Sequence, residues 1–447
     1  MSRVLYDYYR LPANSEGEAF TEIASGADGL FSFGPDVIRE GHYRSDVATL
    51  SNNLPFLDGA RDRHLVGAER NSPLDPAQMI DHLRREYYVK KPASHTQRIV
   101  NQASVRRAYY GVRGLLPACV RRLIQRAYLR DWKALPFPHW PVDLTVDVLH
   151  EEILRLWMKA NGTQKVPFIW FWPEGASSCL IMTHDVETSV GRDRLSALMD
   201  LDESYGMKAS IQLVPEERYA IPENYVQEIR TRGFECNVHD LNHDGRLFED
   251  HLEFIRRAKK VNDYVRRFGA RGFRSGCMYR NQDWFDAFEF SYDMSVPNVA
   301  HLEPQRGGCC TVMPYFIGKI LELPLTTTED YSLFHVLNAY SLDLWKQQVD
   351  LIQQRNGLIS FVAHPDYLVE HRPRRVFESL LDYLRQRVVR ERIWTALPGD
   401  VDRWWRSRSQ MRLVYSGNHW EIEGPEKERA RLAYAVLDSS DRLSHEM

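Results

Sequence analysis

The stretch Cys179-Leu180-Ile181-Met182-Thr183-His184-Asp185-Val186-Glu187 joins an apolar run to two carboxylates. A short apolar run of this kind is consistent with a strand buried on both faces of a parallel sheet. Side chains alternate between the faces of a strand, so Asp185 and Glu187 point the same way. We therefore expect two neighbouring carboxylates at the end of a buried strand.

Three later apolar runs also end in histidine or arginine. Residues 234–238 lead into His239-Asp240-Leu241-Asn242-His243, residues 272–273 into Arg274, and residues 358–363 into His364. The four-residue spacing predicts that His239 and His243 face one point across a single helical turn. Two neutral imidazoles and one carboxylate are a common ligand set for a catalytic zinc, with a further position left for water.

Each of these residues also has an ordinary structural interpretation. Asp185 is placed to cap the helix that follows, and the two histidines fit a solvated loop. Arg274 fits a surface ion pair, and His364, which precedes a proline, fits a turn. The hypothesis of a joint site depends on the order of the four groups and on their common position at strand ends.

In this order the four groups resemble the polysaccharide deacetylase family, also known as the NodB-homology family or family 4 carbohydrate esterases. The family pattern is an Asp at a strand end, then His-x-x-x-His, then an Arg motif, then a late strand that ends in His. The resemblance covers roughly residues 165–395. It implies these site residues: Asp185 as general base, Arg274 as the arginine that holds the base, His364 as general acid, and Glu187, His239 and His243 as metal ligands.

The sequence departs from the family pattern in two places. Common members have adjacent Asp residues in the first motif, whereas Val186 separates the two carboxylates here. The third motif usually reads Arg-x-Pro-Tyr, but Ser275, Gly276 and Cys277 follow the arginine here. This change puts in question the backbone donor that commonly binds the oxyanion, although Gly276 lets the chain approach a ligand closely.

The resemblance implies a metal-dependent hydrolase that removes an N-acetyl or related acyl group from a carbohydrate, either a polysaccharide or its precursor. A divalent metal, which we expect to be zinc, activates water and polarises the carbonyl. Asp185 accepts the proton of the water, and His364 gives a proton to the departing amine. Two alternatives stay open: a non-catalytic barrel that binds a glycan or a partner, and a hydrolase of carbon–nitrogen bonds outside sugars.

Composition limits the remaining function classes. At 447 residues the chain exceeds what one core usually contains, and 43% hydrophobic residues argue against disorder. The net charge of −3 gives no electrostatic case for binding nucleic acid. The six cysteines form no CxxC pair, and we interpret them as reduced core residues of a cytoplasmic protein.

The chain shows no targeting or membrane-spanning pattern. Residues 1–10 contain no apolar signal region, and no apolar run reaches about eighteen residues. We therefore expect a soluble, cytoplasmic protein that acts on a glycan precursor or at a peripheral assembly on the inner membrane face.

Three regions follow from the pattern along the chain. Residues 1–150 form an N-terminal accessory region, with a helix at 76–88 and a basic amphipathic segment at 104–132. We expect that segment to pack on the neighbouring domain, with contact to an anionic membrane surface as the alternative. Residues 400–447 form a C-terminal β appendage, with a hairpin turning at Ser416-Gly417-Asn418 and a third strand near 431–437.

Residues 165–395 alternate between apolar strands and helices, which predicts an α/β fold, a deformed (β/α) barrel. The expected strands are 178–183, 208–214, 234–238, 271–274, 292–296, 320–325 and 358–363, and the expected helices include 192–205, 247–268 and 341–355. Asp330 follows one of these strands, and we expect it to contact His364 or the substrate.

Overall fold

A computed structural model describes residues 3–12, 76–89 and 118–447. Predictions for residues 13–75 and 90–117, including the part of the basic segment at 104–117, lie outside the described residues. The chain divides into two compact units, each built from separate segments. Unit 1 comprises residues 1–88, 144–175 and 404–447, and unit 2 comprises residues 89–143 and 176–403. These units group segments by packing. The sequence-based division differs in kind, because it follows changes in sequence pattern, and it stays a prediction: 1–150, 165–395 and 400–447.

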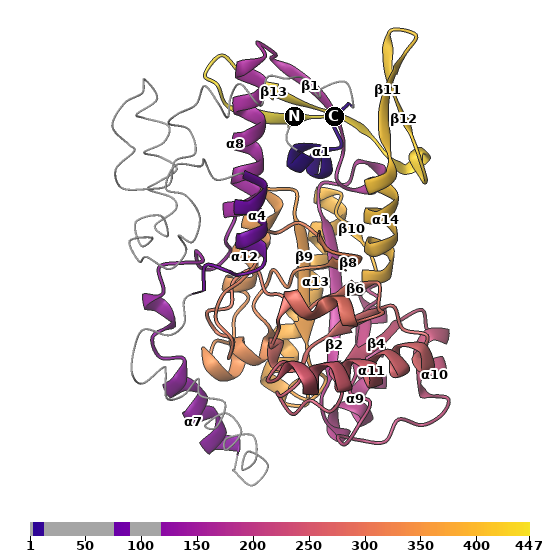
Figure 1. Ribbon diagram of the computed structural model, residues 1–447. Helices are drawn as coiled ribbons and strands as arrows, with labels where there is room; N and C mark the ends of the chain where they lie inside the picture. The colour runs from indigo at the N-terminus through magenta and orange to yellow at the C-terminus, as the bar shows by residue number, and fades with distance from the viewer. Residues whose placement is uncertain (1–2, 13–75, 90–117) are drawn as a thin grey trace. The chain divides into compact units, whose positions relative to one another are not determined.

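The core of unit 2 is a nine-stranded, mainly parallel sheet (Figure 1). At one side, β2 (Cys179–Val186) pairs in parallel with β9 (Leu358–Ala363), β10 (Trp394–Thr395) and β3 (Ser210–Leu213). The order continues through β4 (Glu235–His239), β5 (Gly272–Arg274), β6 (Tyr292–Asp293) and β8 (Ile320–Glu322), and β7 (Tyr315–Ile317) is added antiparallel to β8. Every residue of β2 and β9 is buried, which explains their continuous apolar sequences.

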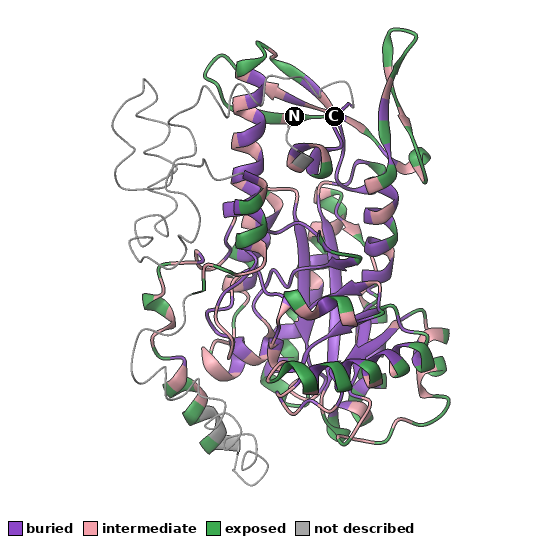
Figure 2. Cartoon of the chain, viewed as in Figure 1, coloured by how far each residue is buried: buried purple, intermediate pink, exposed green. Residues whose placement is uncertain are grey.

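Helices alternate with these strands. They are α7 (Ala118–Tyr128), α9 (Ser189–Ser204), α10 (Tyr225–Thr231), α11 (His251–Phe268), α12 (Asp343–Gln353), α13 (His371–Glu391) and the first residues of α14 (Pro398–Gln410). Short 3-10 turns cover Trp132–Ala134, Gly276–Met278 and Gln282–Ala287, and a π-helical turn, η8, covers Ser332–Val336. Most residues of these strands are buried, whereas the helices present exposed faces (Figure 2). The expected α/β fold of the deformed (β/α) barrel type is therefore confirmed.

Threonine side chains join the segment after β8 to β9. Thr326 Oγ1 donates to Leu358 O at 2.7 Å and accepts from Ser360 N at 2.9 Å. Thr327 Oγ1 donates to Ser360 O at 2.7 Å. These hydroxyls satisfy backbone groups of β9 at a place where the sheet has no neighbouring strand.

Unit 1 contains a three-stranded antiparallel sheet. Its order is β1 (Lys165–Ile169), β13 (Leu432–Leu437) and β14 (Leu443–Glu446). Its helices are α1 (Arg3–Tyr9), α4 (Pro76–Arg84), α8 (Thr145–Ala160) and the end of α14, with 3-10 turns at Pro173–Gly175 and Lys427–Arg429. No helix in the described parts of the chain has the length and hydropathy to cross a membrane.

The C-terminal hairpin forms as expected, with β11 (Arg412–Ser416) paired to β12 (His419–Glu423). The third strand also forms, but the expectation that it joins the hairpin is wrong. It is β13, which pairs with β1, 263 or more positions earlier in sequence (432 − 169 = 263), and buries alternate residues. Trp404 is buried and donates to Phe171 O, so it belongs to the core of unit 1.

Arg408 connects the three segments of unit 1. Its side chain is buried and donates to Tyr8 O at 2.9 Å, Ile169 O at 2.7 Å and Trp170 O at 3.0 Å. One acceptor lies in α1, and two lie at the end of β1 and just beyond it. A guanidinium offers five donors in a fixed plane, which suits it to bind several carbonyl groups at once.

Candidate metal centre and catalytic site

The ends of four parallel strands bring the six predicted site residues together. Asp185 is the penultimate residue of β2 and Glu187 follows that strand. His239 ends β4 and Arg274 ends β5, while His364 follows β9. Parallel neighbours have their carboxyl ends at the same edge of a sheet, so these side chains converge there.

Glu187, His239 and His243 can each direct one ligand atom to a common point. These three atoms lie within 4.8 Å of one another. Nε2 of both histidines is buried and has no hydrogen-bond partner among the described residues. Nε2 of His243 lies 3.0 Å from Glu187 Oε1, but the contact lacks hydrogen-bond geometry. Two unsatisfied imidazole nitrogens beside a carboxylate fit a divalent metal, above all zinc.

Hydrogen bonding fixes His239 in the form that a metal requires. Its Nδ1 lies 3.0 Å from the carbonyl oxygen of Arg274, so Nδ1 carries the proton and Nε2 keeps its lone pair. Burial lowers the pKa of His239 to about 4, although Asp185 acts in the opposite direction. The ring is therefore neutral near pH 7.

The expectation that one helical turn separates His239 from His243 is wrong. His239 is the last residue of a strand, and Asp240 and His243 have φ angles of 55° and 54°. These left-handed residues reverse the chain within a loop and return the second imidazole to the first. Gly276 permits this loop, because a Cβ at that position would lie 2.5 Å from Asp240 Oδ2 and 3.0 Å from His243 Cδ2. Its role here is close packing inside the site wall.

Asp185 is paired with Arg274 in a fully buried setting. Arg274 Nη1 donates to Asp185 Oδ1 at 2.7 Å and to Thr183 Oγ1 at 2.8 Å, and Nε donates to Met294 O at 3.0 Å. Burial alone would raise the pKa of Asp185, but Arg274, with smaller effects of His239 and other groups, lowers it. The other oxygen, Oδ2, lies 3.7 Å from His239 Nε2, so the ionised carboxylate faces the candidate metal position.

His364 is paired with Asp330. The two side chains meet at 2.6 Å between Nδ1 and Oδ1, and the His364 backbone N–H donates to Asp330 Oδ2 at 2.8 Å. Burial would lower the pKa of His364, but the Asp330 carboxylate raises it well above its usual value. The imidazolium is therefore the favoured form, and its Nε2 lies 3.7 Å from Glu187 Oε1. The expected contact between Asp330 and His364 is confirmed.

A second buried His–Asp pair, His184 and Asp202, was not expected from the motifs. Nε2 of His184 lies 2.7 Å from Asp202 Oδ2, and Nδ1 lies 3.0 Å from Ala363 O. The pair connects α9 to the ends of β2 and β9, directly beside Asp185 and His364. Its only sequence signal is the histidine next to the predicted base, because the position of Asp202 depends on how α9 packs.

Two glutamates, Glu303 and Glu329, interact electrostatically with His364 and were also missed. Burial raises the pKa of Glu303 to about 7, against the effects of Arg280, Arg306 and His364. The pKa of Glu329 is raised well above its usual value by burial and then by Glu303. A carboxyl group that keeps its proton near neutral pH can donate a hydrogen bond.

The segment after Arg274 makes a sharp turn. Ser275 N donates to Ser295 Oγ at 2.8 Å, and Cys277 and Met278 both have positive φ angles, 56° and 52°. The backbone therefore turns through two left-handed residues, Cys277, which stands where the family pattern has tyrosine, and Met278, the next residue.

The chain is similar to several solved structures over about half of its length. A putative polysaccharide deacetylase from Mycobacterium smegmatis has 14% identity and a TM-score of 0.41, covering 53% of this chain and 93% of its own. Puue allantoinase has 12% identity and a TM-score of 0.43, covering 53% and 92%. A family 4 carbohydrate esterase from Streptomyces lividans has 11% identity and a TM-score of 0.31, covering 49% and 93%. No family model matches the chain, and no curated protein matches it by sequence.

Proposed function

We propose that the protein is a metal-dependent hydrolase that removes an acyl group, most simply acetyl, from the nitrogen of a carbohydrate. The observation that carries this proposal is the pair of unsatisfied, buried Nε2 atoms facing Glu187, flanked by a carboxylate and an imidazolium. Glu187, His239 and His243 would hold the metal. Bound there, a divalent metal supplies Lewis acidity, which polarises a carbonyl and makes water a stronger acid.

The remaining residues divide the proton transfers between them. Asp185 is ionised and cannot rotate freely, because Arg274 holds one of its oxygens, so it accepts a proton from the attacking water through the other. His364 is protonated and donates to the leaving nitrogen, while Asp330 stabilises its positive charge. Arg274 acts as a positioning residue, since its described contacts are with the base, Thr183 and backbone.

The carbohydrate class rests on the motif resemblance, and the similar structures named as polysaccharide deacetylases agree with it. The test is acetate release from a short N-acetylglucosamine oligomer by zinc-loaded protein. Loss of the base in Asp185→Asn should lower the rate about 10²- to 10⁴-fold with little change in bound metal.

Two results would count against this proposal. Metal-loaded protein that releases no acetate from sugars but opens a cyclic amide would favour the non-sugar hydrolase. A protein that binds the oligomer without turnover, with or without zinc, would favour a non-catalytic barrel.

A further inference from the structure

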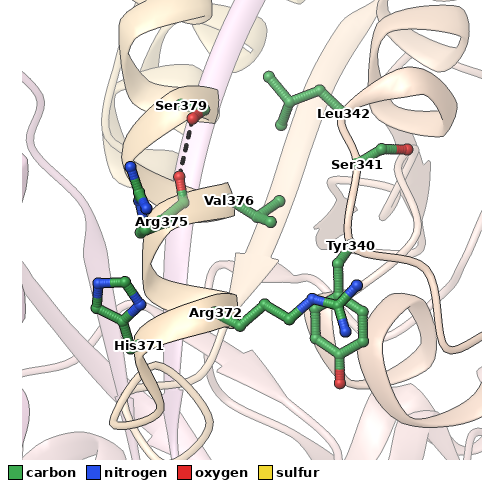
Figure 3. Close-up of a pocket in the computed structure, with 8 residues that line it drawn as sticks. All are labelled: Tyr340, Ser341, Leu342, His371, Arg372, Arg375, Val376 and Ser379. Atoms are coloured by element: carbon green, nitrogen blue, oxygen red, sulfur yellow. Dashed lines mark hydrogen bonds between the residues drawn. The ribbon is translucent and has the colours of Figure 1, made fainter.

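A cavity of about 330 Å³ lies in unit 2 between the start of α13 and the segment 340–342 (Figure 3). One wall continues from β9, which leads into His364, and the other continues from the segment that contains Asp330. The chain enters α13 seven residues after His364 (371 − 364 = 7), and it reaches Tyr340 ten residues after Asp330 (340 − 330 = 10). The cavity therefore belongs to the same set of loops as the catalytic residues.

A series of ring contacts extends from the site towards this cavity. The ring of Tyr367 lies 4.9 Å from His364, 5.2 Å from Tyr331 and 5.1 Å from His335, measured between centroids. Tyr340 stacks at 5.3 Å on Phe334, in the same π-helical turn as His335. Amphipathic rings of this kind offer an apolar face together with a polar edge.

The walls of the cavity combine an apolar floor with positive charge. Val376 and Leu342 face each other across it, and Arg372 reaches from α13 over the ring of Tyr340 (Figure 3). The guanidinium carbon lies 3.9 Å from the ring centroid, so the stacked side chain has a fixed plane with free edges. Arg375 lies one turn further along the helix on the same wall.

Counter-charges for these cations are scarce. Within the described residues, no ion pair joins Arg372 or Arg375 to a carboxylate, and the first turn of α13 contains no acidic residue. Arg374, which does not line the cavity, is paired with Glu378 at 3.0 Å. Asp343 lies beside the cavity but accepts a hydrogen bond from Ser341 at 3.0 Å. The cavity therefore presents two arginines that the fold itself does not neutralise.

We propose that this cavity binds an anionic group of the glycan substrate, a carboxylate or a phosphate on a sugar near the one that is deacylated. A planar guanidinium pairs with either group through two parallel hydrogen bonds, and a second arginine adds to the selectivity. The inference rests on the proposed function for the identity of the substrate, but binding of the anion is independent of turnover.

The test compares three sugars that share one ring and carry no acyl group: glucose, glucuronate and glucose 6-phosphate. Their affinity for the full-length protein is measured by calorimetry or by NMR titration. We expect at least one charged sugar to bind ~10-fold or more tightly than glucose. The affinities of glucuronate and glucose 6-phosphate then show whether a carboxylate or a phosphate is preferred.

Variants then locate the binding site. In Arg372→Gln/Arg375→Gln the preference for the charged sugar should disappear, and Arg372→Lys should retain part of it, because it keeps the charge but loses the planar donor pair. Arg374→Gln is the matched control, since it removes the same charge from the same turn outside the cavity.

Two results would overturn the inference. Equal affinity of wild type for all three sugars would exclude an anion site. If Arg374→Gln lost the preference for the charged sugar as fully as Arg372→Gln/Arg375→Gln does, the preference would come from the overall positive charge of the helix. Because these sugars contain no acetyl group, a failed deacylation assay leaves this test intact, and a failed binding test leaves the hydrolase proposal intact.

Discussion

Two buried ion pairs hold the proposed base and acid in opposite protonation states. Arg274 lowers the pKa of Asp185 against the effect of burial, and Asp330 raises the pKa of His364 against the same effect. Over the interval between the two pKa values the base is ionised and the acid is protonated. We therefore expect a bell-shaped pH dependence whose alkaline limb belongs to His364.

Replacing Asp330 tests the assignment of that limb. Asp330→Asn removes the charge that raises the pKa of His364, so burial is no longer opposed and the alkaline limb should shift about 1 to 3 pH units lower. The pH profile of acetate release measures the shift, with the exposed Asp343→Asn as control. An unchanged alkaline limb would show that another group limits the rate at high pH.

The same pair also links stability to pH. The pKa of His364 is higher in the folded chain than its usual value of 6.5, so the pair contributes fully below pH 6.5. That contribution is lost as the pH rises through the folded value. The stability difference between wild type and Asp330→Asn should therefore be larger at pH 6 than at high pH.

Removing Arg274 should destabilise the fold through Asp185. Arg274→Met leaves the carboxylate buried and unpaired, a loss of about 3 to 5 kcal/mol in the free energy of unfolding at pH 7. Because the pKa of Asp185 is lowered in the folded chain, the contribution of the pair is present above its usual value of 3.8 and is lost as the pH falls through the folded value.

The double variant Arg274→Met/Asp185→Asn is the control for this prediction in urea unfolding. It should recover part of the stability, since no buried charge remains. A double variant as unstable as the single one would mean that the loss comes from Thr183 and Met294, which also bind Arg274.

At the residue scale, the motifs predicted which side chains converge but not how they do so. The period of a strand is sufficient to place Asp185 and Glu187 at one site. His243 comes back to His239 because Asp240 and His243 both adopt a left-handed conformation. Neither residue is a glycine, so the sequence gives no sign of this turn. The partnership of His184 with Asp202 depends on helix packing, which short motifs do not report.

At the scale of elements, the strands that form the barrel core could be predicted and the edges could not. All seven expected strands are present because their apolar runs are bounded by polar or turn residues. The missed strands β7 and β10 contain three and two residues and lie at the two ends of the strand order. The pairing of β13 with β1 was missed because it joins distant segments.

The threonine link between β8 and β9 provides a test at this scale. Thr326→Val keeps the volume but leaves Leu358 O and Ser360 N without their buried partner, so the free energy of unfolding should fall by about 1 to 3 kcal/mol. Chemical denaturation measures the loss, with the exposed Thr395→Val as control. Equal stability of the two variants would show that the hydroxyl does not join the strands.

At the scale of the whole molecule, segments distant in sequence form one unit, while the candidate site lies wholly in the other. Arg408 is the residue that binds all three segments of unit 1. Arg408→Met should lower the free energy of unfolding by about 3 kcal/mol or more, because three buried carbonyl groups lose a charged donor.

The matched control for this variant is the exposed Arg403→Met. Thermal unfolding measures the effect, and metal content measured below the transition should not change. Loss of metal in Arg408→Met would contradict the assignment of the candidate site to unit 2 alone.

The most direct test of the metal-dependent hydrolase is the amount of metal bound per chain. Protein purified without chelator and supplied with zinc should hold about one ion per chain, and His239→Ala/His243→Ala should hold almost none. The exposed pair His371→Ala/His419→Ala should keep the wild-type amount. Negligible metal in the wild type, or equal metal in wild type and the site variant, would contradict the account.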